Sequence, residues 1–272
     1  MQSKRMSAAA GVVVVLLLAV LVSAKPAAAA IIDVYDGYDG GSFDFAPLQT
    51  YFTGFGNTVN RLAPTFTSLA GAQFVILSMP GGENSGTPLS LSPSQLAAID
   101  AYVAGGGRLL LNSDGAEAYQ LSVNAVNTIL TSLGSSIVNQ STTSQTGYRD
   151  TTHILANAFT TGVLDVNYGY TSSLTGGTAL VFGNSTTDNG QEFIAYQAIG
   201  AGYVFVSGDV DIADNINSTT TNNNGILYCN FAGLNCGSSG PVPEPSSLTL
   251  FLVAGTAMIL KRKFASTPSS NS

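Results

Sequence analysis

Phe74-Val75-Ile76-Leu77-Ser78 is a run of four apolar residues and a serine, a pattern typical of a strand buried in a parallel sheet. The clearest helix of the chain follows it, because Ser92 is a good N-cap and Gln95 completes a capping box. The glycines at 105–107 end that helix, and Arg108-Leu109-Leu110-Leu111-Asn112 reads as a second buried strand. A strand, a helix and a strand in this order predict an α/β fold with a largely parallel sheet.

The pattern extends on both sides of this unit. Upstream, two strands at 31–35 and 58–62 flank a short helix at 47–52. Downstream, Ser122 is expected to cap a second helix, and the polar residues 139–152 to form a long loop. The other expected elements are strands at 163–166, 178–182, 193–197 and 203–207, a hairpin turn at 200–202 and a closing helix at 224–234. We therefore expect a doubly wound, flavodoxin-like sheet with antiparallel additions in the second half, and a hydrophobic helix at each end of the chain.

The first 30 residues (1–30) have the layout of a secretory signal peptide. Lys4 and Arg5 give a positive start, residues 8–22 are apolar, and small residues follow. We expect cleavage near Ala30, with Ala24 as the alternative. The apolar stretch is short for a membrane span, so an uncleaved N-terminal anchor is the less favoured interpretation.

The other end carries three features in order: Pro243-Glu244-Pro245, an apolar stretch at 248–260, and Lys261-Arg262-Lys263. This order resembles the PEP-CTERM sorting signal, which in that family is recognised by exosortase, a membrane transpeptidase-like enzyme, and removed near the Pro-Glu-Pro motif. The resemblance implies that residues 241–263 are a sorting signal with a short transmembrane helix, and that 264–272 are a cytoplasmic tail. The basic cluster has two lysines where arginine predominates in the family.

The length of this apolar stretch favours transient insertion into the membrane. Its thirteen residues reach only about 20 Å as a helix, against a hydrocarbon core of about 30 Å. The positive-inside rule keeps the basic cluster cytoplasmic and leaves the main body outside. A plain anchor that is never processed is the alternative, and in either case residues 31–240 face outward.

Residues 31–240 are long enough for one well-buried domain, and acidic residues far outnumber basic ones among them. Their only basic residues are Arg61, Arg108 and Arg149, whereas 15 of the 16 acidic residues of the chain lie there. The resulting charge near −12 argues against nucleic acid and anionic lipid as partners, because both are bound mainly through Lys and Arg.

Cys229 and Cys236 are the only cysteines and lie close together in the sequence. In the oxidising compartment that the signal peptide predicts, a local disulfide is the default. Two cysteines alone make a poor metal site, and no histidine lies near them.

The order of parts in the body resembles class I glutamine amidotransferase-like domains: a strand ending in Pro80-Gly81-Gly82, a helix, a strand and the tight turn Ser113-Asp114-Gly115. Thr152-His153-Ile154-Leu155 is similar to a His-Pro-Ile segment of the relatives similar to trehalose-utilisation proteins, and residues 202–209 are similar to their late strand ending in Gly-Asp. The resemblance implies an amidotransferase-like α/β domain over most of 31–234. At the position of Ser113, catalytic members of the family have a nucleophilic Cys, or a Ser in some peptidases. Because this chain lacks the amidotransferase Cys there, glutamine hydrolysis is not expected.

Ser113 is the candidate nucleophile if the protein is an enzyme, and His153, the only histidine of the chain, is the candidate base. In the similar family the matching His is not the general base, and Leu111 replaces the first Gly of a hydrolase Gly-x-Ser-x-Gly elbow. A surface serine hydrolase is therefore the alternative function. The simpler interpretation is a polar turn that caps the following helix.

Acidic residues follow several expected strands, at the edge where a doubly wound sheet binds its ligands. No Lys or Arg stands among them, and oxygen-only sites of this kind suit Ca²⁺, the only cofactor that we consider. The candidate metal ligands are Asp36, Asp39, Asp209, Asp211 and Asp214. The other acidic residues of these loops are Glu83, Asp114 and Glu117. A solvated acidic rim without a cation is the simpler alternative.

Tyrosines near the same loops favour a third chemistry, stacking on the faces of sugars. The candidates, which we expect to be exposed, are Tyr35, Tyr38, Tyr119, Tyr168 and Tyr170, and half-buried packing is the alternative for each. PEP-CTERM proteins as a family are associated with exopolysaccharide and biofilm production. We therefore expect a non-catalytic protein at the outer surface of a bacterium or in its extracellular matrix. Its expected partners are the secretion machinery, exosortase, the membrane during sorting, and a glycan.

Overall fold

The computed structural model describes residues 29–37, 44–79, 91–115, 120–143, 148–184, 190–217, 223–234 and 236. Residues 1–28 of the predicted signal peptide and every part of the predicted sorting signal lie outside these residues. Among the described residues, no helix has both the length and the apolar character needed to span a membrane. All the described helices and strands belong to one compact unit that ends at Leu234.

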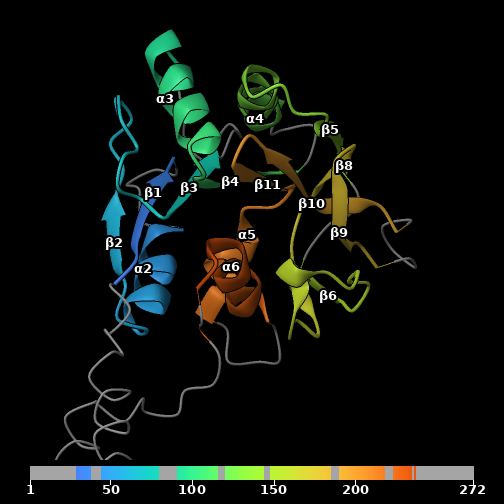
Figure 1. Ribbon diagram of the computed structural model, residues 1–272. Coiled ribbons are helices and arrows are strands. Elements are labelled where there is room, and N and C mark those ends of the chain that lie inside the picture. Colours follow the sequence, from blue (N-terminus) through green and yellow to red (C-terminus); the bar gives the residue numbers. More distant parts are fainter. Residues whose placement is uncertain are drawn as a thin grey trace, which may run out of the picture. The chain divides into compact units, whose positions relative to one another are not determined.

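A seven-stranded sheet in the order β2-β1-β3-β4-β11-β10-β9 forms the centre of this unit (Figure 1). Its strands are β1 (Ile31–Asp36), β2 (Thr58–Arg61), β3 (Phe74–Met79), β4 (Arg108–Ser113), β9 (Thr178–Phe182), β10 (Glu192–Ile199) and β11 (Gly202–Ser207). Neighbours from β2 to β11 pair in parallel, and β10 runs antiparallel to both β11 and β9. The prediction of a largely parallel sheet with antiparallel additions in the second half is confirmed.

Helices cover both faces of the sheet: α3 and α4 lie on one side, and α2, α5 and α6 on the other (Figure 1). The helices are α2 (Phe45–Thr53), α3 (Pro93–Ala104), α4 (Gln120–Ser132), α5 (Asp211–Asp214) and α6 (Asn224–Ala232), with 3₁₀ turns η2 (Ala158–Thr160) and η3 (Asn215–Asn217). The predicted capping box is present, since the Ser92 hydroxyl accepts from the Gln95 N–H and the Gln95 side chain accepts from the Ser92 N–H. All six residues of β3 are buried between the two helical layers, as the continuous apolar pattern predicts.

Two small antiparallel sheets lie beside the main one. Strand β5 (Val138–Thr143) pairs with β8 (Ser172–Thr175), and β6 (Arg149–Thr151) pairs with β7 (Val166–Tyr168). The expectation of a long loop at 139–152 is therefore wrong. Apart from Val138, β5 is made of Asn, Gln, Ser and Thr, so no apolar alternation marks it as a strand. Its pairing depends on β8, whose paired residues are 29 to 37 positions further along the chain.

The predicted role of Ser122 is also wrong, because Ser122 lies inside α4 rather than at its N-cap. Its hydroxyl is buried, donates to the carbonyl of Met79, and accepts from the N–H of Asp114. Ser122 therefore ties α4 to the ends of β3 and β4. A local N-cap pattern cannot distinguish this long-range contact from a cap.

Candidate functional site

The carboxyl ends of the central parallel strands carry buried polar residues. Ser78 ends the apolar run of β3, Asn112 that of β4, and Ser207 that of β11, and all three are essentially inaccessible to solvent. The Asn112 amide donates to the Ser78 hydroxyl over 3.1 Å, which links β3 to β4. This is the edge at which doubly wound sheets place their ligands, so it is the first candidate site.

Ser113, the predicted nucleophile, is fully buried at this edge. Its hydroxyl lies 3.0 Å from the Ser172 hydroxyl and 3.2 Å from the Ser207 carbonyl, and it accepts from the Asn139 amide at 2.5 Å. The Ser113 hydroxyl is thus hydrogen-bonded on several sides, which is how buried hydroxyls are usually accommodated.

Residues 170–172 cover the ends of β4 and β11 above this network. The Gly115 N–H donates to the Tyr170 carbonyl over 3.1 Å, and the Ser172 N–H donates to the Gly208 carbonyl over 2.8 Å. A Cβ on Gly115 would overlap the backbone of Thr171, and a Cβ on Gly208 would overlap the carbonyl of Ser172. Both positions therefore need glycine for this close approach, and the approach separates Ser113 from solvent.

The structure does not bring His153 to Ser113. His153 is exposed, its ring stacks on Phe182 at 4.8 Å, and its carbonyl accepts from the Phe182 N–H. The adjacent Ile154 pairs with Val181 of β9, and β9 is three strands away from β4. At the usual strand spacing, the two side chains are roughly 15–20 Å apart, far outside hydrogen-bond reach.

The acidic residues do gather at the carboxyl edge, but backbone amides occupy several of their oxygens. Asp36 accepts from the N–H groups of Asp44 and Phe45 at 3.1 and 3.0 Å, and so caps the start of α2. Asp209 accepts from the N–H groups of Gly169 and Asp211 at 2.5 and 2.8 Å. These carboxylates therefore stabilise the ends of elements.

The pKa values of the carboxyl groups also indicate that the acidic residues lie close together. Burial, and then the charge of Asp211, raises the pKa of Asp209 well above its usual value. Burial and the charge of Asp214 raise the pKa of Asp211 to about 6. Even so, no three His, Cys, Asp or Glu side chains in the described ranges lie close enough together to hold a metal ion. Asp39, the remaining candidate ligand, lies outside those ranges.

Asp44 is the buried acid that sequence reasoning missed. It is inaccessible to solvent, and among the described residues no donor meets either carboxylate oxygen with normal hydrogen-bond geometry. Burial raises the pKa of Asp44 far above the usual value, and the charges of Asp36, Asp211 and Asp214 raise it further, whereas the nearby Ser78 lowers it only in part. A position just before a short helix was the only sequence signal, and it predicts an exposed cap rather than a buried acid.

The tyrosines divide between core and surface. The expectation that Tyr35 and Tyr168 are exposed is wrong, because Tyr35 lies in the core beside β3, and Tyr168 stacks on Phe193 at 4.7 Å. Tyr170 is 40 % exposed, and Tyr148, which sequence reasoning missed, is 57 % exposed. The Tyr148 side chain lies against the carboxylate of Asp211. Tyr38 and Tyr119 lie outside the described residues.

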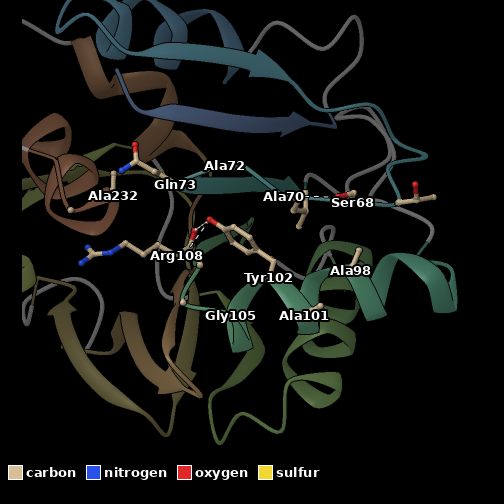
Figure 2. Close-up of a pocket in the computed structure, with 16 residues that line it drawn as sticks. Ser68, Ala70, Ala72, Gln73, Ala98, Ala101, Tyr102, Gly105, Arg108 and Ala232 are labelled. Atoms are coloured by element: carbon tan, nitrogen blue, oxygen red, sulfur yellow. Dashed lines mark hydrogen bonds between the residues drawn. The ribbon is translucent and has the colours of Figure 1, made fainter. Parts of the chain in front are cut away.

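A cleft of about 720 Å³ opens at the opposite edge of the sheet, near the amino ends of β3 and β4 (Figure 2). One wall is the chain before β3, residues 67–73, and the other is the C-terminal half of α3 with the turn at 105–107. Arg108 and the end of α6 close one side. No sequence motif marked this cleft, because its walls are mainly Ala, Gly, Ser and Thr.

Cys229 lies in α6, and neither it nor Cys236 is a free thiol. The pairing expected for them stays a prediction, and neither cysteine takes part in the two regions described above.

No known family model matches the sequence, and no curated protein matches it. Among solved structures, the chain is similar to a β-galactosidase from Rahnella sp. R3, with 15 % identity, a TM-score of 0.50, and coverage of 79 % of this chain and 33 % of that one. It is also similar to a β-galactosidase from Bacillus circulans sp. alkalophilus, with 12 % identity, a TM-score of 0.46, and coverage of 75 % and 31 %. It is similar as well to a GMP synthase subunit from Thermoplasma acidophilum, with 12 % identity, a TM-score of 0.46, and coverage of 75 % of this chain and 93 % of that one. The chain spans about a third of each β-galactosidase, and at such identities the likeness shows an α/β fold alone.

Proposed function

We propose that the chain is an exported, exosortase-sorted protein of the cell surface or extracellular matrix, and that its α/β domain binds a glycan without cleaving it. The observation that carries the non-catalytic part is the burial of Ser113 beneath residues 170–172. A nucleophile needs an approach for its substrate and a base within hydrogen-bond reach. In the described part of the chain Ser113 has neither, so it serves as a buried polar contact.

The strand order supports a doubly wound, amidotransferase-like scaffold. From β2 to β11 the parallel strands follow the flavodoxin-like order, in which the second strand lies at the edge and the first lies beside the third. Helices on both faces agree with that architecture. Because a fold does not imply a function, we assign to this scaffold no activity of the amidotransferases.

Exposed aromatic and uncharged polar surface supports a glycan as the ligand. Tyr148 and Tyr170 expose large parts of their rings, and Tyr148 lies beside Asp211. Such rings stack on sugars, and carboxylates accept from sugar hydroxyls. The strongly negative body disfavours acidic polymers. A neutral exopolysaccharide therefore fits the surface best.

A glycan array tests the proposal. The full chain, extracted in mild detergent, is expected to bind neutral glycans in preference to acidic ones. Added calcium is expected to change little, because Asp36 and Asp209 already accept from backbone amides. If no glycan is bound and a fluorophosphonate labels Ser113, the serine hydrolase alternative replaces this proposal.

Replacement of Pro243, Glu244 and Pro245 by alanine tests the sorting part. The unaltered chain is expected outside the cell in a form that lacks its C-terminal tail, because the apolar stretch at 248–260 is too short to be a comfortable permanent anchor. The triple variant is expected to stay in the membrane fraction at full length. The measurement is the mass of the protein in each cell fraction. Identical masses and fractions for both chains would exclude sorting through this motif.

A further inference from the structure

The cleft at the amino edge has the dimensions of a ligand site. Its volume, about 720 Å³, falls within the range of roughly 300–1,000 Å³ in which small ligands are usually bound. It stays open because the side chains along its walls are small. Ala70 and Ala72 face Ala98, Ala101 and Gly105 across the gap (Figure 2).

Tyr102 supplies a rigid aromatic surface in this cleft. Figure 2 shows its side chain reaching from α3 to the backbone of Arg108. There the hydroxyl donates to the Arg108 carbonyl over 3.0 Å and accepts from the Arg108 N–H over 3.1 Å. The ring lies against Gly107, where a Cβ would overlap three of its carbon atoms. A ring already fixed in this way loses little conformational entropy when a ligand stacks on it.

The charge of the cleft favours an uncharged ligand. No Asp or Glu stands among its lining residues, although the chain has 16 acidic residues. The one cation, Arg108, is turned toward the end of α6, where its guanidinium donates to the carbonyls of Asn230 and Phe231 over 3.2 and 2.9 Å. Thr67, Ser68 and Gln73 add hydroxyl and amide groups to the wall, and these suit a ligand rich in hydroxyls.

From this geometry we infer that the cleft binds the neutral glycan of the proposed function, with one sugar ring stacked on Tyr102. The inference rests on that function and adds the place where the glycan binds and the residue on which it stacks. It assigns the glycan to the amino edge of the sheet instead of the tyrosines at the carboxyl edge. Tyr102 and the five small residues then form the site.

Two variants test the inference with a matched control. Ala101→Leu fills the cleft from an exposed position of α3, and Tyr102→Leu removes the stacking surface. Ala97→Leu makes the same change as Ala101→Leu at an exposed α3 residue that does not line the cleft. Melting followed by circular dichroism identifies any variant that does not fold.

Isothermal titration of the full chain with cellohexaose, mannohexaose and β-1,4-galactohexaose measures the effect, and hexagalacturonate provides the acidic comparison. We expect at least one neutral probe to bind better than hexagalacturonate. Ala101→Leu and Tyr102→Leu should each weaken that binding by about tenfold, and Ala97→Leu should change it less than twofold.

The outcomes separate the inference from the function on which it rests. If the unaltered chain binds neither these probes nor any glycan of the array, both are overturned. If it binds a neutral probe and both cleft variants bind as tightly, only the cleft assignment is overturned. In that case, loss of binding in Tyr148→Ala or Tyr170→Ala would place the glycan at the carboxyl edge. Preference for hexagalacturonate would overturn the ligand class.

Discussion

Gly115→Ala is expected to lower the free energy of unfolding by about 3 kcal/mol or more. The added methyl group would overlap the backbone of Thr171, and the neighbouring N–H and carbonyl groups are hydrogen-bonded on both sides of the contact. Neither chain segment can move without breaking these bonds. Urea unfolding followed by circular dichroism measures the loss.

Gly134→Ala is the control for this substitution. Gly134 has a φ of 66°, but nothing lies within 4 Å of the position its Cβ would take, so only backbone strain of about 1 kcal/mol is expected. If Gly115→Ala costs no more than Gly134→Ala, residues 170–172 are not packed on the end of β4. These residues would then not shield Ser113 from solvent.

Asp44→Asn is expected to stabilise the protein at pH 7.5 by about 2 kcal/mol and to have little effect near pH 4. Burial raises the pKa of the folded carboxyl above the value of 3.8 usual for Asp, so the folded state holds this proton more tightly than the unfolded state. The contribution of Asp44 to the free energy of unfolding is therefore highest below pH 4 and falls as the pH rises toward the pKa of Asp44 in the folded state. Asparagine is neutral throughout and removes this loss.

The readout is the difference in free energy of unfolding between Asp44→Asn and the unaltered chain from pH 4 to pH 8. This difference is needed because Asp211 and Glu192, with pKa values raised to about 6 and 7 by burial, destabilise both chains in the same direction. Asp150→Asn, at an exposed carboxylate, is the control for the loss of one negative charge. A flat difference for Asp44→Asn would contradict the raised pKa of Asp44. A difference that instead becomes destabilising as the pH rises would indicate a cation bound to the Asp44 carboxylate and would restore the calcium hypothesis.

Local signals in the sequence predict the centre of the fold well. The apolar run of β3 and the capping box at Ser92 each depend on residues a few positions apart, and both are found as expected. Strand β5 could not be predicted in this way, because its residues are polar and it becomes a strand only by pairing with β8. Tertiary pairing there outweighs weak local preference.

The candidate site was predictable only where topology decides it. The rule that parallel strands share one carboxyl edge correctly brings Asp36 and Asp209 to the same side of the sheet. It cannot predict that backbone amides occupy both carboxylates, or that residues 170–172 cover Ser113 from 57 or more positions away. The Tyr102 cleft was missed for the same reason, since its two walls meet only in the folded chain.

Binding without turnover is the central claim, and one measurement tests it directly. The full chain is incubated with the neutral hexasaccharide that it binds best, and the bound fraction and newly formed reducing ends are followed in the same sample. We predict saturable binding, recovery of the intact hexasaccharide, and no fluorophosphonate adduct on Ser113. Release of shorter sugars, or an adduct that disappears in Ser113→Ala, would contradict the account.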